Sequence, residues 1–153
     1  MLIIEDNLEN QETQKLIALH LKGMHSITPE EFVFALDLKE LKQPNIFFYS
    51  SWEGEKITGI GALKLHPNQI GEIKSMRTHP DYLRRGVGEL ILRHLINVAK
   101  QKKITSLYLE TGTAEEFLPA IYLYKKLGFV EAGPFAEYKA NSFSRFFKLI
   151  LDN

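Results

Sequence analysis

Residues 77–90 read RTHPDYLRRGVGEL, and this stretch decides how the rest of the chain is interpreted. A predicted strand ends at Thr78 and a short loop follows. Two glycines, Gly86 and Gly88, then open a helix whose apolar stripe is predicted to run to about residue 102. Glycine allows the backbone to adopt positive φ and to approach a ligand closely. The segment is therefore a strand-to-helix turn whose backbone a ligand can reach.

The start of this helix also favours an anion. The first helical turn leaves several N–H groups without partners, and the helix dipole makes that end partly positive. Phosphate groups bind well at such ends, and Arg84 and Arg85 add two guanidinium groups. A tight turn with two solvated arginines is the alternative interpretation. Two other phosphate motifs are excluded, because a Walker A loop needs Gly-Lys-Ser/Thr and a dinucleotide fingerprint needs glycine at Ile91.

Composition limits the class of protein. The 153 residues are predicted to form a single domain, residues 1–153, with one core. The formal net charge is zero, which argues against nucleic acid or an anionic membrane as the main partner. The absence of cysteine excludes disulfides, thiolate nucleophiles and cysteine-bound metals, and it suits a cytoplasmic protein. The N-terminus turns acidic too early for a signal peptide, and no apolar run approaches the roughly 20 residues of a membrane helix.

Periodicity along the chain predicts an α/β fold, with helices and then an antiparallel meander in the first half. Thr28-Pro29-Glu30-Glu31 is typical of a capped helix start, Glu53-Gly54-Glu55-Lys56 of a hairpin turn, and Gly128 of a helix C-terminus. The second half alternates strand and helix, which implies right-handed crossovers and helices on both sheet faces. Strands are expected near 2–4, 46–49, 57–65, 71–78, 107–109, 129–131 and 146–151, and helices near 9–25, 28–36, 87–102 and 115–127.

Two motifs resemble those of the GCN5-related N-acetyltransferases, the GNAT family. The segment 83–88, LRRGVG, is similar to the family's motif A, Gln/Arg-x-x-Gly-x-Gly/Ala after the fourth strand, although Leu83 replaces the usual Gln or Arg. The segment 121–129, IYLYKKLGF, is similar to the family's Leu-Tyr-x-x-x-Gly-Phe segment. Many members have Asn seven residues before the tyrosine, where this chain has Phe117. The element order agrees with the family over nearly the whole chain.

This resemblance implies a fold and a cosubstrate. It predicts a central mixed, mostly antiparallel, twisted sheet of about six to seven strands, with acetyl-CoA between the fourth and fifth strands. The loop's backbone amides would hold the coenzyme A pyrophosphate, and the end of the fourth strand would contact pantetheine and the acetyl carbonyl. Tyr124 would protonate the departing thiolate, with a core tyrosine as the alternative, and no metal is needed. The predicted cofactor-binding residues are Met76, Arg77, Thr78, Arg84, Arg85, Gly86, Val87, Gly88, Glu89 and Tyr124.

Acetyl transfer to an amine also needs a base. A lysine-like amine has a pKa near 10.4, so only about one molecule in a thousand is neutral at pH 7. Glu72 is the leading candidate, because family members with a glutamate base on the fourth strand place it similarly; a solvent-facing glutamate is the alternative. His79 is a weaker candidate. The acceptor site is expected to include His25, Asp37 and Glu110, with Glu110 also a second candidate base, unless these residues cap or solvate helices.

The predicted activity is direct transfer of an acetyl group from acetyl-CoA to an amine of a small molecule or peptide, in a ternary complex. Without cysteine, no acyl-cysteine intermediate can form. Two other functions stay open: a non-catalytic acyl-CoA-binding regulatory module, and a nucleotide-dependent enzyme that uses the glycine turn. The late aromatic residues fit a core, an acceptor wall or a homodimer surface, and the sequence leaves the identity of the acceptor open.

Overall fold

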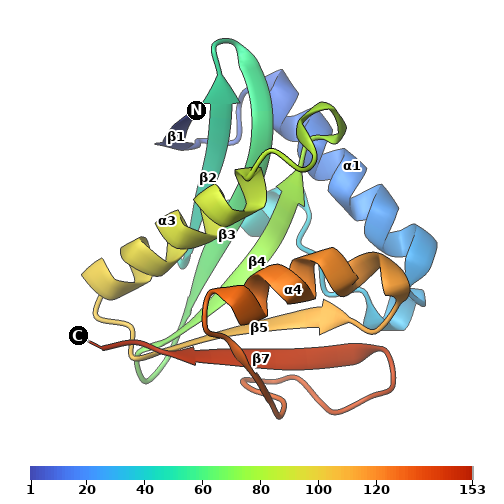
Figure 1. Ribbon diagram of the computed structural model, residues 1–153, viewed down its shortest axis with the longest axis vertical. Helices are drawn as coiled ribbons and strands as arrows, with labels where there is room; N and C mark the ends of the chain where they lie inside the picture. The colour runs from blue at the N-terminus through green and yellow to red at the C-terminus, as the bar shows by residue number, and fades with distance from the viewer. Residues whose placement is uncertain (153) are drawn as a thin grey trace.

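A seven-stranded sheet forms the centre of the computed structural model, which describes residues 1–152 (Figure 1). Its strand order is β1-β2-β3-β4-β5-β7-β6, and among these residues β4 and β5 are the one parallel pair. The predicted mixed, mostly antiparallel sheet is therefore confirmed. The strands are β1 Leu2–Glu5, β2 Ile46–Glu53, β3 Lys56–His66, β4 Ile70–Thr78, β5 Ser106–Gly112, β6 Val130–Ala132 and β7 Ser144–Ile150.

Helices cover both faces of this sheet, as predicted. In the described chain, α3 and α4 pack on one face, and α1 and α2 pack on the other (Figure 1). None of the helices within residues 1–152 has the length and apolar character that crossing a bilayer requires. The helices are α1 Gln11–Ile27, α2 Leu38–Leu41, α3 Val87–Gln101 and α4 Leu118–Lys126, with 3-10 turns at Glu30–Phe32, Pro80–Tyr82 and Glu115–Phe117.

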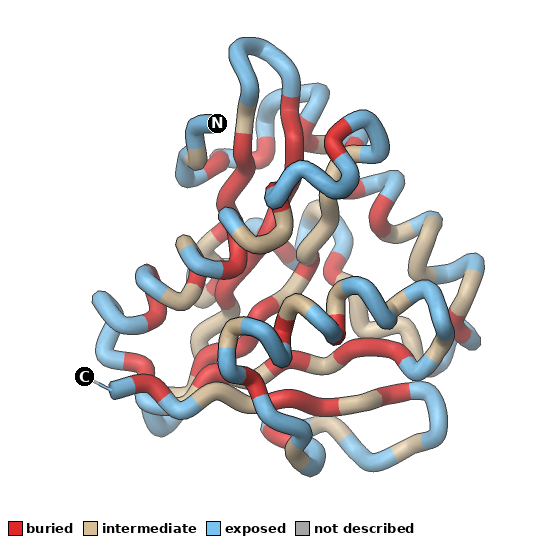
Figure 2. Tube along the Cα trace, in the orientation of Figure 1, coloured by how far each residue is buried: buried red, intermediate tan, exposed pale blue. Residues whose placement is uncertain are grey.

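Apolar side chains follow the periodicity of these elements and fill a layer on each side of the sheet. Beneath α3, Ile91 and Leu95 pack with Leu107 of β5, and beneath α1, Leu16 packs with Ile60 of β3. These five side chains are at most 2% exposed. Each such burial stabilises the fold by about 1.5–3 kcal/mol before entropy is counted. Figure 2 shows the result, with burial concentrated in the strands and exposure on loops and outer helix faces.

The parallel pair β4–β5 is short, and this positions the site. The two strands pair only where Ile70–Glu72 lies beside Ser106–Tyr108. Beyond that point they diverge, as the arrows of β4 and β5 show in Figure 1. The facing backbone edges of their C-terminal halves therefore have no ladder partners within the described part of the chain. An open V results, with α3 and α4 above it.

A bulge adds to this divergence. The register between β3 and β4 shifts between Ile60 and Ala62, and Ser75 on β4 adopts a left-handed φ of +56°. An extra residue bends a strand and re-aims the side chains that follow it. Because of the bulge, Met76 packs into the layer beneath α3, whereas Arg77 reaches α1 on the other face.

The second crossover contains an inserted strand. The chain passes from β5 through α4 to β6, in the strand–helix–strand order that the sequence predicts. However, β6 pairs with β7, and β7 lies between β6 and β5 as an antiparallel neighbour of both. Gly128 ends the region of α4 with a φ of +100°, which confirms its predicted role as a helix C-terminus.

The helix predicted to start at Thr28 is wrong. Residues 28–36 contain only the 3-10 turn already named, and Thr28 ends α1 in an extended conformation. A capping box does form, but at Asp37 and Glu40, where α2 begins. The Glu40 backbone N–H donates to Asp37 Oδ1 at 2.8 Å, and the Asp37 N–H donates to Glu40 Oε1 at 3.2 Å.

Aromatic contacts explain why the segment does not continue as a helix. Phe32 stacks on Phe143 with ring centroids 5.0 Å apart, and Phe34 meets Tyr138 edge-on at 5.1 Å. Both partners lie in the loop between β6 and β7. Such tertiary contacts override the modest local preference for a helix. They join two segments that are about 100 residues apart in the sequence.

Candidate active site

The diverging strands open onto a cleft with a volume of about 690 Å³. Its walls come from α1, the end of β4, the loop before α3, the end of β5 and α4. Most of the predicted site residues line it, namely Glu72, Met76, Arg77, Thr78, Arg84, Gly86, Val87, Gly88, Glu89, Glu110 and Tyr124. Four predicted residues, His25, Asp37, His79 and Arg85, lie outside the lining.

The loop before α3 has the conformation of an anion site. Arg84 and Gly86 adopt left-handed φ angles of +62° and +80°, whereas Arg85 between them does not. Alternation of this kind turns successive N–H groups toward one point. Gly86 is the N-cap of α3, and no side chain caps the first turn of this helix. The cradle formed by residues 84–88 therefore presents N–H donors, together with the positive end of the helix dipole, to the cleft.

The two glycines of the cradle serve different purposes. Gly86 has open space where a Cβ would lie, but L side chains rarely adopt its φ of +80°. A Cβ on Gly88 would lie 3.3 Å from Leu123 Cδ2 and 3.8 Å from Thr78 Oγ1. Gly86 is thus required by backbone conformation, whereas Gly88 keeps α3 close to both α4 and β4.

The arginines and the glutamate of this loop are held differently. Arg84 lines the cleft. Arg85 turns away, with its Nη2 3.4 Å from Glu53 Oε2 and its guanidinium 4.9 Å from the Tyr82 ring. Of the predicted cofactor-binding residue Arg85, only the backbone therefore lies in the loop beside the cleft. Glu89 accepts hydrogen bonds from the lysine and arginine of an exposed ion-pair cluster that joins α3 to α4, namely Lys126 Nζ at 2.6 Å and Arg93 Nε at 3.0 Å.

Tyr124 reaches the cleft from α4. Its ring packs against Phe129 and Phe147, with centroids 6.0 and 6.3 Å away, and the side chain is almost fully buried. Burial, and then the negative charge of Glu110, raise the pKa of Tyr124 to about 12. The hydroxyl therefore keeps its proton at neutral pH and can donate it. Tyr124 both belongs to the core and faces the cleft, so the two interpretations of the sequence are compatible.

Glu110 lies on β5, on the opposite side of the V from β4. Its Oε2 accepts a hydrogen bond from Ser144 Oγ at 2.7 Å, and no other hydrogen bond to its carboxyl forms within residues 1–152. Burial raises the pKa of Glu110 to about 7, against the lowering effects of the Ser144 hydrogen bond and the charge of Lys74. A carboxylate with a pKa near the working pH is suited to proton transfer.

Glu72, the leading base candidate from the sequence, is bonded by three neighbours and is only 1% exposed. His66 Nε2 lies 2.8 Å from its Oε1, Lys74 Nζ lies 3.2 Å from its Oε2, and Tyr138 donates to Oε2 at 2.5 Å. Lys74 also donates to the Tyr138 hydroxyl at 2.8 Å. Burial raises the pKa of Glu72, but these neighbours, His66 above all, bring it below its ordinary value. The carboxylate is therefore held in its charged form.

The remaining predicted residues lie outside the cleft. His25 lies exposed in the last turn of α1, and Asp37 is the exposed cap of α2. His79 caps the 3-10 turn after β4, where its Nδ1 accepts from the Asp81 N–H at 3.1 Å. The structure thus brings Glu72, Glu110 and the end of β4 together but leaves His25, Asp37 and His79 apart from them.

Sequence reasoning missed four side chains that shape the cleft or its network, namely His20, Phe34, Lys74 and Tyr138. Two of them carry a usable signal. His20 shares one face of α1 with Met24 and Ile27, at spacings of four and seven residues, and Lys74 follows Glu72 by two residues on one face of β4. Tyr138 comes from an irregular loop, and no periodicity predicts its position.

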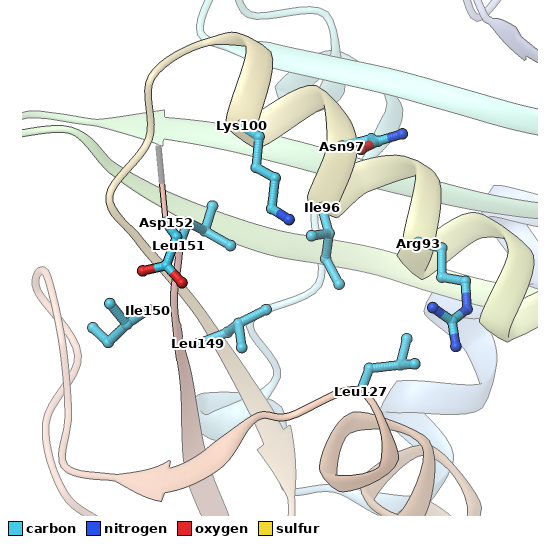
Figure 3. A pocket seen from close by; sticks show the side chains of 9 residues that line it. All are labelled: Arg93, Ile96, Asn97, Lys100, Leu127, Leu149, Ile150, Leu151 and Asp152. Carbon is cyan, nitrogen blue, oxygen red and sulfur yellow. The ribbon is translucent and has the colours of Figure 1, made fainter.

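A second hollow of about 460 Å³ lies elsewhere, between the C-terminal half of α3 and the end of β7 (Figure 3). Side chains such as Ile96 and Lys100 from α3 and Leu149 from β7 line it. None of the predicted site residues and no part of the cradle belongs to this hollow. The chemistry-bearing groups therefore gather in the cleft between β4 and β5.

Comparison with known proteins agrees with this geometry. The model of the acetyltransferase (GNAT) family matches residues 13–129. An uncharacterized N-acetyltransferase of Escherichia coli K12, YedL, is 48% identical over 95% of this chain and 92% of its own length. An uncharacterized N-acetyltransferase of Bacillus subtilis 168, YsnE, is 42% identical over 87% of this chain and 88% of its own length.

Solved structures share the fold. A Klebsiella pneumoniae chain assigned as an acyl-CoA N-acyltransferase superposes with a TM-score of 0.80, at 24% identity over 99% of this chain and 97% of that one. A Bacillus subtilis acetyltransferase in complex with CoA superposes with a TM-score of 0.70, at 18% identity over 97% of both chains. With the family match, the two relatives, the splayed sheet and the glycine cradle in agreement, this chain belongs to the GNAT family of acetyltransferases.

Proposed function

We propose that the cleft between β4 and β5 binds acetyl-CoA and transfers its acetyl group to the amine of a small molecule. One observation carries the proposal: a single cleft contains the cradle at residues 84–88, the partly buried Glu110 and the buried Tyr124. The cradle supplies donors for a diphosphate, and the pair supplies a proton acceptor and a proton donor. Membership of an acetyltransferase family supports this reading of the two features together.

The cleft also has features that suit the extended pantetheine chain of acetyl-CoA. The free backbone edge of β4 at residues 76–78 can hydrogen-bond amide groups of a pantetheine chain, as a neighbouring strand would. Phe117 packs so closely over Gly112 that a Cβ on this glycine would overlap the phenyl ring. The pantetheine chain would therefore meet an aromatic ring at this point, where many family members offer an asparagine.

The two titratable residues can divide the proton transfers. Glu110 takes a proton from the amine as its nitrogen forms the new C–N bond at the thioester carbonyl carbon. Tyr124 gives its proton to the sulfur as the C–S bond breaks. A backbone N–H at the end of β4 stabilises the negative charge that develops on the carbonyl oxygen. Glu110 gains one proton and Tyr124 loses one, so the charge of the pair is unchanged and exchange with solvent restores both groups.

Glu110 suits the base role better than Glu72. A general base must accept a proton near the working pH, and the pKa of Glu110 is about 7. The pKa of Glu72 lies below its ordinary value, and its two oxygens already bond His66, Lys74 and Tyr138. We therefore assign Glu72 the task of fixing β4 and Lys74, and Glu110 that of receiving the amine proton.

Calorimetric titration with acetyl-CoA tests the cradle. We expect Gly86→Val to lower affinity at least about tenfold, because a β-branched side chain disfavours the positive φ that forms the cradle. Gly54→Val is the matched control, since Gly54 has a φ of +59°, has open space around it and lies in the hairpin between β2 and β3. Normal acetyl-CoA affinity in Gly86→Val, or no affinity in the unmodified protein, contradicts the proposal.

A regulatory module that binds acetyl-CoA without turnover is the alternative function. Release of free CoA in the presence of an amine panel separates the two, because only transfer liberates the thiol. Tight acetyl-CoA binding without thiol release across the panel favours the module. The cytoplasmic location and the homodimer stay predictions from the sequence.

A further inference from the structure

The Arg77 guanidinium is a cation without a carboxylate partner. Its Nε donates to His20 Nδ1 at 3.0 Å, and its Nη2 donates to the His20 carbonyl oxygen at 3.2 Å. Both acceptors are neutral, and no carboxylate among residues 1–152 forms an ion pair with Arg77. Because Arg77 is only partly exposed, its charge is incompletely solvated, and burial lowers its pKa. A partly buried cation without a counterion favours an anionic ligand.

The guanidinium lies on the face of the sheet opposite the cradle. Arg77 Nη2 approaches Gly23 of α1 so closely that a Cβ on this glycine would come within 2.6 Å of it. Thr78, by contrast, faces Gly88 at the start of α3. The backbone of residues 76–78 can thus serve the thioester while the Arg77 side chain serves whatever enters from the α1 side.

The groups around Arg77 do not neutralise its positive charge. Burial, then the charges of Arg77 and Lys74, lower the pKa of His20 to about 3, so this histidine stays neutral. The charge of Lys74 is balanced by Glu72, to which it is bonded at 3.2 Å. Arg77 therefore carries the uncompensated charge on this wall of the cleft.

A second polar group in the same cleft lacks a partner. Ser75 Oγ is buried, the residue being 8% exposed, and forms no hydrogen bond among residues 1–152. It belongs to the bulge directly before Arg77 and lines the cleft. Buried hydroxyls without partners are rare in native proteins, so this bulge is an unusual feature of the wall.

The rest of this wall is apolar. Met24 and Ile27 of α1 and Phe34 of the following loop line the cleft beside His20. Phe34 is held by its edge-on contact with Tyr138 at 5.1 Å. The wall therefore combines one unpaired guanidinium, one unpaired hydroxyl and an apolar surface.

We propose that the acetyl acceptor is an amino carboxylate with an apolar side group, such as an apolar α-amino acid. Its carboxylate pairs with Arg77, its side group packs on Met24, Ile27 and Phe34, and its amine faces Glu110. This proposal rests on the proposed function for the transfer of acetyl to that amine. It assigns the charge and polarity of the acceptor, which the family leaves open.

Matched ligand pairs test the role of the carboxylate. Phenylalanine and phenethylamine, leucine and 3-methylbutylamine, and methionine and 3-(methylthio)propylamine each differ only in a carboxylate. Each is titrated by calorimetry into protein saturated with CoA, so binding is read without turnover. We expect at least one of the three carboxylates to bind about tenfold or more tighter than its decarboxylated partner, as a charge-assisted contact allows.

Variants assign that preference to Arg77. Arg77→Gln should reduce the ratio of affinities within the pair to about two or less, and Arg77→Lys should retain part of it. Arg145→Gln is the matched control, because Arg145 pairs with Glu131 at 2.9 Å and lies outside the cleft. The ratio is measured within one variant, so a lower fraction of folded protein affects both ligands equally.

The outcomes separate the two proposals. Equal binding of both members in all three pairs, no binding of any carboxylate, or a preference that persists in Arg77→Gln overturns the assignment of the acceptor. A wild-type protein that binds no acetyl-CoA overturns the proposed acetyl transfer, and the assignment of the acceptor with it. If the protein binds acetyl-CoA but the two members of each ligand pair bind equally well, only the assignment of the acceptor is overturned.

Discussion

Two glutamates on neighbouring strands of the cleft behave in opposite ways. Glu72 on β4 has three bonded neighbours, and its pKa lies below the ordinary value. Glu110 on β5 has one bond, from Ser144, and its pKa is about 7. Glu72 is buried and Glu110 is partly buried, so burial acts on the pKa of both in the same direction. The neighbours differ in number and in charge. For this reason Glu72 stays ionised, whereas Glu110 can exchange a proton near neutral pH.

The largest effect is expected from removing the titratable carboxyl. Glu110→Gln keeps the shape and a polar amide but cannot accept a proton. We expect kcat to fall about 10²–10⁴-fold, the usual contribution of a general base, while acetyl-CoA affinity changes little. Steady-state rates and calorimetry measure the two quantities. If Glu110→Gln keeps near-normal turnover with an amine substrate, the division of roles between the two glutamates is wrong.

Removing the other carboxyl should act on stability. Glu72→Gln leaves Lys74, with a side chain only 8% exposed, without its anionic partner. Breaking a buried pair in this way costs about 3–5 kcal/mol, which corresponds to a Tm lowered by roughly 10 °C in a chain of this length. Thermal or urea unfolding measures it. An unchanged Tm would show that the network is not an anchor, and Glu131→Gln, which breaks an exposed pair, is the control.

Tyr124→Phe tests the proposed proton donor. We expect kcat to fall about 100-fold, the low end for acid–base catalysis, because the departing thiolate can also take a proton from water. Acetyl-CoA affinity should hardly change, since the ring remains in its packing against Phe129 and Phe147. Equal losses of turnover and affinity would remove the acid role. Tyr122→Phe is the control, because Tyr122 on the same helix is 75% exposed.

The pH dependence should be smaller but should have a defined sign. Glu110 must be ionised to accept a proton, so kcat/KM calculated for the neutral form of the amine should rise about tenfold per pH unit below 7 and level off above it. The contribution of Glu110 to folding stability should change with pH in the opposite direction. The pKa of Glu110 is raised from 4.5 to about 7, so its favourable contribution is full below pH 4.5 and is lost as the pH rises through 7.

A variant comparison isolates this contribution. Above pH 7 we expect Glu110→Gln to be more stable than the parent by about 1–2 kcal/mol, with no such gain near pH 5. The pKa of Glu72 is lowered, so its contribution to stability should have the opposite pH dependence. This contribution is present above pH 4.5 and is lost as the pH falls below that value. Unfolding curves at pH 5 and pH 8 measure the trend for Glu110, and curves at pH 3 and pH 5 measure the trend for Glu72. The same gain in Glu110→Gln at pH 5 and pH 8 would show that the side chain does not titrate between them.

Local rules suffice to predict most of the elements and the conformation of the loop before α3, through glycine's access to positive φ at Gly86 and the spacing of apolar residues along α3. The location of Tyr124 at the cleft was implied by the resemblance of residues 121–129 to a family segment. The same local rules placed a helix at residues 28–36, where aromatic contacts from a distant loop prevented it.

The surroundings of the charged groups in the cleft come from contacts between residues far apart in the sequence. Glu72 is bonded by Tyr138 across 66 residues, Glu110 by Ser144 across 34, and Arg77 reaches His20 across 57. A pKa or an uncompensated charge depends on burial and on such neighbours, which a local pattern does not contain. For this reason the sequence pointed to Glu72 as the base, while we propose Glu110 from its surroundings, and Arg77 has no carboxylate partner within residues 1–152.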